Sequence, residues 1–195
     1  MMDWDKRYTD NDIPWDKGYF FPSLPFMVEK FPEVFSPKSR AFVPGCGLGH
    51  DAVFLQHQEL ITVGADISAT AIEQAKLRSR KVIWQTMDLF FPLPQNMHWA
   101  FDVVWEHTCF CAIPVEKRPD YVNVMSQLLA PGKHLAGVFF IKTGVPIEDG
   151  PPFFCSREEV IELFSPLFTL AWEGEPPESY EGREGKELLM LWQRK

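Results

Sequence analysis

The sequence predicts an α/β fold, in which one domain contains a mostly parallel sheet of seven strands with helices on both faces. Two observations support this prediction. Short runs rich in β-branched and aromatic residues alternate with segments of helical periodicity, an order typical of parallel sheets covered by helices. The chain has 195 residues, of which 46% are apolar and 24% are charged. That length suits a single core of about 100–200 residues.

The expected elements follow one another through short connections. An N-terminal segment over residues 1–38, rich in aromatic residues and proline, precedes a core over residues 39–195. Pro131-Gly132 is expected to end the helix before it. The last two strands flank the turn-rich stretch GEPPESYEGREG, so we expect an antiparallel pair at the sheet edge. In order, we expect strand 40–43, helix 50–57, strand 61–67, a helix ending near residue 80, strand 81–87, strand 101–106, helix 121–129, strand 135–141, a helix from residue 156, and strands 168–173 and 187–193.

Two helix starts carry a recognisable capping pattern. Thr70 and Glu73 have the spacing of a capping box, in which a hydroxyl and a carboxylate satisfy the free N–H groups of the first turn. Ser68 is an alternative start for the same helix. Ser156 and Glu159 repeat the spacing, so we expect a second capping box there.

Acidic side chains outnumber basic ones, and this disfavours one class of partner. The 27 Asp and Glu residues against 19 Lys and Arg give a formal net charge of −8, whereas nucleic-acid binding depends on clustered positive charge. No run of about 18 apolar residues is present, so we expect no membrane span. The N-terminus lacks the apolar segment of a signal peptide, and the four cysteines lack paired spacing. We therefore expect reduced thiols and a cytoplasmic protein.

The strongest local motif is VPGCGLGHD at residues 43–51, directly after a predicted strand and before a predicted helix. Glycines at this place let the backbone turn sharply and approach a ligand, while the helix start offers free N–H groups. A nucleotide-like cofactor suits such a turn. The spacing is G-x-G-x-G, because His50 stands where the dinucleotide fingerprint G-x-G-x-x-G needs glycine. A tight turn that binds nothing is the alternative interpretation.

Acidic residues stand at the predicted ends of the next strands. Asp66 ends the second strand, 17 residues after Gly49, near the interval at which a carboxylate accepts the hydroxyls of a ribose. Asp88 follows the third strand, and Glu106-His107 ends the fourth. The carboxyl ends of parallel strands meet at the crevice where the strand order reverses, so we expect these residues to lie together. Each acid taken alone could instead cap a helix or a turn.

Together these motifs resemble a known family. The glycine turn, the acids after strands two and three, and the LLAPGK turn are similar to class I S-adenosylmethionine-dependent methyltransferases, which have a Rossmann-like fold. Within that class the sequence resembles the thiopurine methyltransferase family, and most of all its thiol and halide methyltransferase branch. The resemblance spans the chain and lies in six segments: WDKRYTDNDIPWDKG, VPGCGLGHD, DISATAIEQA, FDVVWEHTCFCAIP, GPPFFCSREEV and REGKELLMLW.

The resemblance implies which residues bind S-adenosyl-L-methionine. Aromatic residues of the N-terminal segment would cover the cofactor as a lid, with Tyr8 standing where plant members have tryptophan. The glycine turn would hold the methionine part, Asp66 the ribose hydroxyls, and Asp88 with the Leu89 backbone the adenine edge. The implied cofactor-binding residues are Trp4, Tyr8, Trp15, Gly45, Cys46, Gly47, Gly49, Asp66, Ile67, Asp88, Leu89, Glu106 and His107.

The methyl acceptor is expected in the same crevice. His107 occupies the position of a family tyrosine and is the candidate general base, because imidazole titrates near neutral pH. Arg118 and Arg183 lie in segments that match the family pattern over the mouth of the site. They are candidates for attracting an anionic acceptor, with surface ion pairs as the alternative. Aromatic walls, in part explained by core packing, are expected from Phe20, Phe21, Phe110, Phe153 and Phe154.

The cysteines predict no metal centre. Cys109 and Cys111 alternate at an expected strand end, so they should face opposite sides of the sheet, and no histidine cluster joins them. Cys46 lies beside a helix start, which lowers a thiol pKa, but the preferred interpretation is the packing of a small residue.

The sequence therefore predicts a methyltransferase that moves a methyl group to a small soft nucleophile by in-line displacement, leaving S-adenosyl-L-homocysteine. Thiols, hydrosulfide, thiocyanate, halides and thiopurines all suit such a site. Two alternatives remain open at this point: an NAD-dependent oxidoreductase using the same crevice, and a cofactor-binding module without turnover. We expect a small-molecule partner, neither nucleic acid nor membrane, and a monomer.

Overall fold

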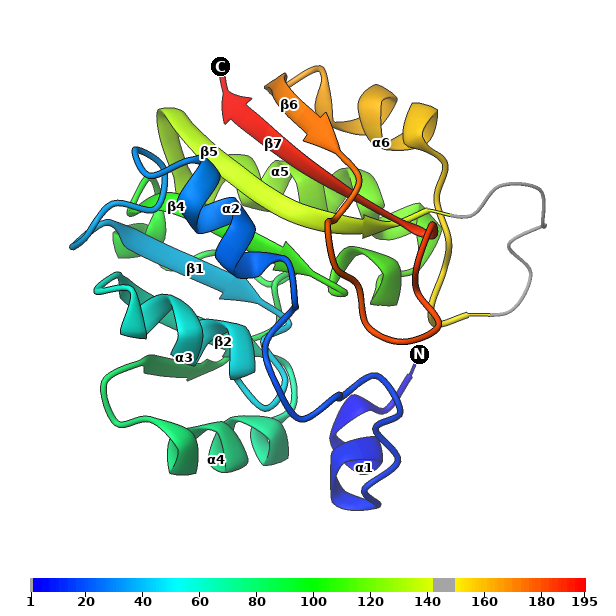
Figure 1. Cartoon of the computed structure of the whole chain (residues 1–195). Coiled ribbons are helices and arrows are strands. Elements are labelled where there is room, and N and C mark those ends of the chain that lie inside the picture. Colours follow the sequence, from blue (N-terminus) through cyan, green and yellow to red (C-terminus); the bar gives the residue numbers. More distant parts are fainter. Residues whose placement is uncertain (1, 142–149) are drawn as a thin grey trace.

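A computed structural model describes residues 2–141 and 150–195, which form a seven-stranded sheet. The strand order is β3-β2-β1-β4-β5-β7-β6 (Figure 1). β7 pairs antiparallel with β5 and β6, and the other neighbouring strands pair parallel. This confirms the predicted sheet and its antiparallel C-terminal strand. The strands are β1 (Arg40–Pro44), β2 (Ile61–Asp66), β3 (Ile83–Thr86), β4 (Phe101–His107), β5 (Leu129–Phe140), β6 (Phe168–Gly174) and β7 (Glu187–Arg194).

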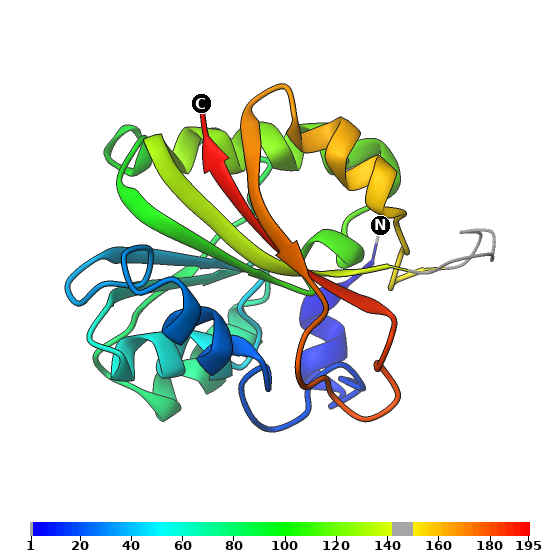
Figure 2. The ribbon, with the colours of Figure 1, turned by 45° about the horizontal axis from the view of Figure 1, so that its top comes forward.

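Helices cover both faces of the sheet, as the alternation of elements predicts. α2, α3 and α4 lie on one face and α5 and α6 on the other, while α1 sits apart at the end of the sheet near the N-terminus (Figure 2). The helices of the described chain are α1 (Trp4–Thr9), α2 (Leu24–Lys30), α3 (His50–His57), α4 (Ala69–Arg78), α5 (Arg118–Leu128) and α6 (Arg157–Phe164).

The two-residue period of β1 divides the core between these faces. Phe42 packs with residues of α5 and α6, whereas its neighbours Ala41 and Val43 pack with residues of α2 and α3. Both sides are sealed, since Phe42 and Ala41 are fully buried. β1 is therefore a central strand, and its carboxyl end opens directly into the glycine turn that follows it.

The N-terminal segment is not a lid over its whole length. Phe21, Leu24 and Met27 are fully buried and pack against the sheet with Trp105. Their burial makes α2 part of the core. The expectation of a lid over residues 1–38 is therefore too broad, and only the part before Phe20 contributes side chains to the large cavity described below.

Several expected boundaries shift by a few residues. The N-cap of α4 is Ser68, whose side chain accepts a hydrogen bond from the Ala71 N–H, so the Thr70 and Glu73 capping box is wrong. Glu73 instead pairs with Lys76 at 2.6 Å. Ser68 takes the cap because it stands two residues after the end of β2 and its hydroxyl is held by the Asp5 carboxylate.

The other boundary corrections have comparable local causes. The Ser156 hydroxyl accepts from the Glu159 N–H at 3.0 Å, but the Glu159 carboxylate turns to Arg118, so half of the second capping box forms. β5 begins at Leu129 and includes Pro131-Gly132, because Leu129 already pairs with Phe101 before the register shifts. α4 ends at Arg78 rather than near residue 80.

The segment after β4 is helical rather than extended. β4 ends at His107, and residues 110–112 form a turn of 3-10 helix. Cys109 and Cys111 therefore do not alternate along a strand, and both line the large cavity. The four cysteines are free. Among residues 2–141 and 150–195, no helix is long and apolar enough to cross a membrane.

Candidate active site

A cavity of about 550 Å³ opens at the carboxyl ends of β1, β2 and β4. The glycine turn after β1 forms its floor, and residues of α1 and of the loop between β6 and β7 close it from outside. Figure 1 shows that α1 and this loop, drawn in blue and orange-red, reach the same end of the molecule. This is the crevice at which open α/β sheets bind ligands.

The glycine turn has a backbone that other residues would strain. Gly47 has φ of 53°, and a Cβ added there would lie 2.8 Å from the Tyr8 hydroxyl oxygen. Gly47 thus keeps open the space between the turn and α1. Gly45 and Cys46 line the cavity beside it, and the N-terminus of α3 follows directly.

Gly49 has a different role from the one expected. It caps α3 in the left-handed region at φ 83°, and a Cβ there would stand 2.3 Å from the Trp84 ring. Its side of the turn faces β3 and does not line the cavity. The glycine is required by helix packing, so its inclusion among the cofactor-binding residues is not supported by its position.

Asp66 organises the turn from the end of β2. Its carboxylate accepts from the Gly47 N–H and from the Ser68 N–H, each at 2.9 Å. Those hydrogen bonds lower the pKa of this carboxyl, but burial raises it by more. A carboxylate has about four acceptor sites, so Asp66, which lines the cavity with Ile67, keeps acceptor capacity for a ligand.

The aromatic residues of the N-terminal segment form a stacked cover. Trp4 and Tyr8 each meet the Trp15 ring edge-on, with ring centroids 5.4 and 5.8 Å apart. The Trp15 indole N–H donates to the Tyr8 hydroxyl at 3.3 Å. Asp5 ties α1 to the core, because its carboxylate accepts from the Ser68 hydroxyl at 2.6 Å and from the Thr70 N–H at 2.8 Å. Trp4, Tyr8 and Trp15 all line the cavity.

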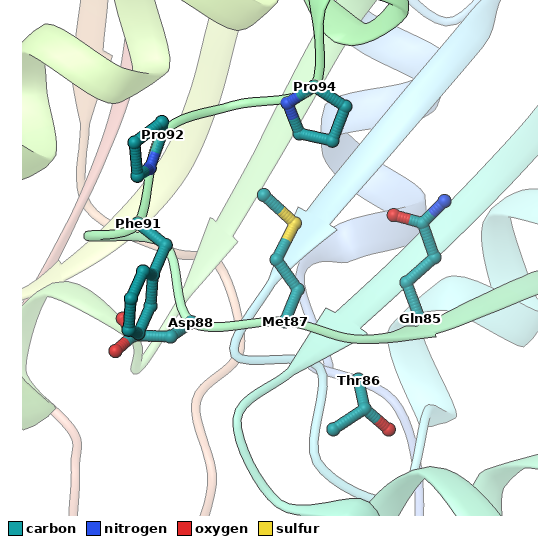
Figure 3. A pocket seen from close by; sticks show the side chains of 7 residues that line it. All are labelled: Gln85, Thr86, Met87, Asp88, Phe91, Pro92 and Pro94. Atoms are coloured by element: carbon teal, nitrogen blue, oxygen red, sulfur yellow. The ribbon is translucent and has the colours of Figure 1, made fainter.

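A second hollow of about 470 Å³ adjoins the cavity beyond β3. Figure 3 shows Asp88 and Phe91 projecting together on one side of it and Met87 toward Pro94. Asp88 accepts from the Phe90 N–H at 2.9 Å, and it lines both hollows. Leu89 also lines the main cavity. This edge is where a flat ring could lie between apolar side chains and a carboxylate.

His107 closes the inner wall at the end of β4. Its Nδ1 lies 2.8 Å from Asp51 Oδ2, and the side chain is 13% exposed. Asp51 also accepts from the Trp105 indole N–H at 2.7 Å and from the Phe21 N–H at 2.8 Å. His107 lines the cavity as expected, whereas its carboxylate partner was not identified from the sequence.

Arg183 lies in the cavity wall, as expected, on the loop between β6 and β7. Its guanidinium carbon is 5.4 Å from the Phe140 ring centroid and 5.6 Å from that of Tyr180. One nitrogen is 3.3 Å from the buried Glu187 carboxylate. A charge that is 17% exposed and stacked on two rings is well placed to face an anion entering the cavity.

Arg118 does not lie at the mouth of the site, so its expected role in attracting the acceptor is wrong. The side chain is fully buried, and its guanidinium binds Glu159 at 2.5 Å and the Phe153 carbonyl at 2.6 Å. The long Arg118 side chain, at the start of α5, can point inward because the Glu159 carboxylate pairs with its charge there. Arg118 thereby fastens α6 and the loop after residue 150 to α5.

Glu106 also faces away from the cavity. Its carboxylate accepts from the Phe110 N–H at 2.8 Å and from the Tyr121 hydroxyl, inside the core beneath α5. Burial raises the pKa of this carboxyl to about 7. Successive residues of a strand point to opposite faces, so Glu106 cannot accompany His107 into the cavity. Its side chain is structural.

The aromatic wall comes from other residues than those expected. Phe21 and Phe110 are core residues, and Phe20 packs on Phe54 with ring centroids 4.5 Å apart. None of the five expected phenylalanines lines the cavity, and Phe153 and Phe154 are among these. Tyr19, Phe140 and Tyr180 take that place, along with Phe90 and Phe91. Phe140 ends β5 and the others lie in loops, so no periodicity marks them, and none of the six segments of the family resemblance contains them.

The thiols in the cavity wall are held in their neutral form. Burial raises the pKa of Cys46 and of Cys109 well above the ordinary range, and raises that of Cys111 to about 12. They act as small apolar side chains, which agrees with the packing interpretation of Cys46. Across the described residues, no group of three or more His, Cys, Asp or Glu is arranged to hold a metal ion.

A solved methyltransferase structure has a similar architecture. The N-methyltransferase NodS from Bradyrhizobium japonicum, in complex with S-adenosylhomocysteine, superposes with a TM-score of 0.72 at 17% identity, covering 97% of this chain and 95% of that one. This likeness shows the fold. Because the chain also matches the model of an S-methyltransferase family, the molecule is an S-adenosylmethionine-dependent methyltransferase with the class I fold.

Sequence comparisons identify the family. The model of the thiopurine S-methyltransferase family matches residues 1–180, and the chain belongs to this family. It is 32% identical to thiocyanate methyltransferase 1 of Brassica oleracea over 201 residues, covering 98% of this chain and 84% of that protein. It is 27% identical to the thiopurine S-methyltransferase of Nitrosospira multiformis, over 83% of this chain and 79% of that one. The cofactor is S-adenosylmethionine, so the NAD-dependent interpretation is set aside.

The residues present fit this cofactor. Gly47 leaves the gap that a Cβ would fill between turn and lid, and Asp66 faces the same gap with acceptor capacity. Aromatic faces of Trp4 and Trp15 suit a positive sulfonium nearby. The cavity is also within the range of about 300–1,000 Å³ typical of small-molecule sites.

Proposed function

We propose that this enzyme methylates small sulfur nucleophiles, namely thiols, hydrosulfide, thiocyanate and thiopurines, with halides as further acceptors. The observation that carries the proposal is a single cavity with two kinds of wall. The glycine turn, Asp66 and Asp88 line one part, and His107 and Arg183 line another. The names of the Brassica and Nitrosospira relatives support a sulfur acceptor.

The cofactor side is assigned as follows. Gly45, Cys46 and Gly47 hold the methionine part beside the N-terminus of α3, where free N–H groups suit a carboxylate. Asp66, next to Ile67, accepts from the ribose hydroxyls. Asp88 and the Leu89 backbone meet the adenine edge, near the hollow of Figure 3. Trp4, Tyr8 and Trp15 cover the ligand from outside.

The chemistry asks the protein mainly to align the acceptor and exclude water. When bound, the cofactor supplies an activated methyl group on a sulfonium. Soft anions are already nucleophiles, so the role of Arg183 is to attract them electrostatically. The Tyr180 and Phe140 rings make this part of the cavity wall apolar. The attacking atom approaches in line with the bond that breaks. His107 stands at the acceptor wall.

The proposal is tested by supplying one acceptor at a time. We expect methyl transfer from S-adenosylmethionine to at least one of thiocyanate, hydrosulfide, thiophenol, a mercaptopurine and iodide, detected as the methylated product in the headspace or by chromatography. Absence of product with all of them, from a folded protein that binds the cofactor, would contradict the proposal and favour a binding module without turnover.

Arg183→Ala serves as a paired variant in the same assay. We expect the KM for thiocyanate, which is always anionic, to rise roughly tenfold, and the KM for neutral thiophenol below its pKa to change less. Arg157→Ala is the matched control, because Arg157 pairs with Glu173 on the surface at 2.8 Å and does not line the cavity. An equal rise in KM for both acceptors in Arg183→Ala would contradict the role of Arg183 in attracting anions.

The same proposal includes a cytoplasmic setting and a monomer. Free cysteines at four positions suit a reducing compartment. One chain supplies both parts of the cavity wall, so a partner copy is not needed to complete the site. The net charge of −8 favours small acceptors over nucleic acids.

A further inference from the structure

We propose that His107, oriented by Asp51, is the general base that removes the proton from a neutral thiol acceptor. The acceptors would then include thiols that are still protonated at neutral pH. This inference rests on the proposed function, because it concerns the acceptor of that same methyl transfer. Asp51 would be a positioning residue, since it acts through the imidazole that it binds.

The Asp51 carboxylate has the surroundings of an ionised acceptor. Three donors from three segments converge on it: the Phe21 N–H at 2.8 Å, the Trp105 indole N–H at 2.7 Å and His107 Nδ1 at 2.8 Å. Burial would raise the pKa of this carboxyl, but its contacts with His107, the Trp105 indole N–H and the Phe21 N–H outweigh burial and lower the pKa. Asp51 therefore stays a carboxylate at neutral pH.

The state of Asp51 settles which imidazole nitrogen carries the proton. An ionised carboxylate only accepts hydrogen bonds, so His107 Nδ1 must donate to it. In neutral imidazole the other nitrogen, Nε2, then has a free lone pair. Nε2 is buried and has no hydrogen-bond partner among residues 2–141 and 150–195, while His107 lines the cavity. Nε2 is thus an unpartnered acceptor just behind the cavity wall, and a thiol packed against the imidazole would supply the S–H group that it lacks.

Two rings hold the imidazole in this orientation. Phe21 lies on one side with a centroid distance of 4.9 Å, and Tyr180 stacks on it at 5.8 Å with 24° between the planes. Burial raises the Tyr180 pKa, so the phenol stays neutral. A half-turn of the ring would put a carbon where Nδ1 now lies and so lose the Asp51 hydrogen bond.

The charges around the ring come from four segments. Asp51 lies in α3, and Glu106 precedes His107 in β4 with its carboxylate turned into the core. Asp16 lines the same cavity on the segment after α1. Arg183, the positive charge of this set, lies on the β6–β7 loop over the Tyr180 ring. The direct contact is with Asp51, which makes it the partner that supports proton uptake.

The proposed step conserves atoms and charge. A lone pair of the thiol sulfur forms the new C–S bond to the methyl carbon, and the bond from that carbon to the sulfonium breaks, its electron pair remaining on the departing sulfur. The S–H proton moves to His107 Nε2, and the imidazolium later releases it to water. The sum is thiol plus S-adenosylmethionine giving methyl thioether, S-adenosylhomocysteine and one proton.

The test compares two acceptors in the same variants. In His107→Gln we expect kcat/KM for an aliphatic thiol with a pKa near 9, assayed at pH 7, to fall about a hundredfold or more. We expect kcat/KM for thiocyanate, which has no proton to lose, to fall at least about tenfold less than kcat/KM for the thiol does. Asp51→Asn should lower the thiol reaction selectively as well. The exposed His57→Gln is the matched control.

Two further readouts separate base catalysis from loss of structure. In His107→Gln the thiol reaction should rise with pH along the titration of the thiol itself, since only the thiolate then reacts. Ring-nitrogen NMR of the wild-type protein should show the tautomer with the proton on Nδ1, and Asp51→Asn should lose that preference. S-adenosylhomocysteine binding and the melting temperature show whether each variant is folded.

The outcomes distinguish this inference from the proposed function. Wild-type activity with thiocyanate and thiol, together with selective loss of the thiol reaction in His107→Gln, supports the general base. Equal losses for both acceptors in folded His107→Gln, or a wild-type tautomer with the proton on Nε2, would overturn it while leaving methyl transfer intact. A wild-type enzyme inactive with every sulfur acceptor contradicts the proposed function instead.

Discussion

Asp51 and Glu106 are buried carboxylates that the protein uses in opposite ways. Asp51 is surrounded by donors and stays ionised beside the cavity. Glu106 faces the core on the other side of β4, and burial raises its carboxyl pKa to about 7. Two neighbouring residues at the end of β4 thus have different places: His107 lines the cavity, and Glu106 is a structural carboxyl in the core. Neither role follows from the residue type alone.

The raised Glu106 pKa predicts a pH-dependent stability. A carboxyl with a raised native pKa contributes stability that is present below the unfolded value of 4.5 and lost as pH rises through about 7. At about 1.4 kcal/mol per pH unit, the loss is on the order of 3 kcal/mol. The side chain in Glu106→Gln stays neutral at every pH. The free energy of unfolding of this variant, relative to that of wild type, should therefore increase from pH 5 to pH 8.

Urea unfolding at pH 5, 6, 7 and 8 measures this difference. Glu162→Gln, at an exposed position on α6, is the control and should shift little over the range. A difference between wild type and Glu106→Gln that is constant with pH would mean that Glu106 titrates normally. The variant also keeps an oxygen for the Phe110 N–H, so any constant offset reports the altered contact with Tyr121.

At the scale of elements, α1 is a lid held by few contacts. Asp5 bonds the Ser68 hydroxyl and the Thr70 N–H at the start of α4. The helix has six residues, and Tyr8 is its buried side chain. An element of this size depends on the surface it covers, because isolated short helices are unstable in water. The lid should therefore close more firmly when the cavity is filled.

Asp5→Ala tests this attachment. We expect the dissociation constant for S-adenosylhomocysteine to rise roughly three- to tenfold, because two hydrogen bonds to the core are lost, and tryptic cleavage within α1 to become faster. Calorimetry and limited proteolysis measure the two effects. Asp10→Ala removes an acid that pairs with Lys6 on the same helix and should change neither. Unchanged affinity in Asp5→Ala would mean that α1 is not fastened through Asp5.

At the scale of the whole molecule, the sequence predicted the architecture better than the site. Apolar periodicity predicts where the seven strands lie, because the buried positions of strands such as β1 and β5 accept few residues that are not apolar. The glycine turn and Asp66 were found because they are local signals beside predicted strand ends. Arg118 and the Thr70 cap were misplaced, since the sequence does not show that Arg118 turns inward to Glu159 or that Ser68 takes the cap. Asp51 was missed because its partners lie far apart in the chain.

The most direct measurement is calorimetric titration of S-adenosylhomocysteine into wild type, Asp66→Asn and Asp66→Ala. We expect one site in wild type and affinity at least about tenfold weaker in both variants, on the order of 1.4 kcal/mol, with the fold retained. Asp102→Asn is the control, because Asp102 bonds Arg40 and Lys133 at the opposite end of the sheet. Wild-type affinity in folded Asp66→Ala, or tight binding of NAD in place of S-adenosylhomocysteine, would contradict the assignment of this cavity as the cofactor site.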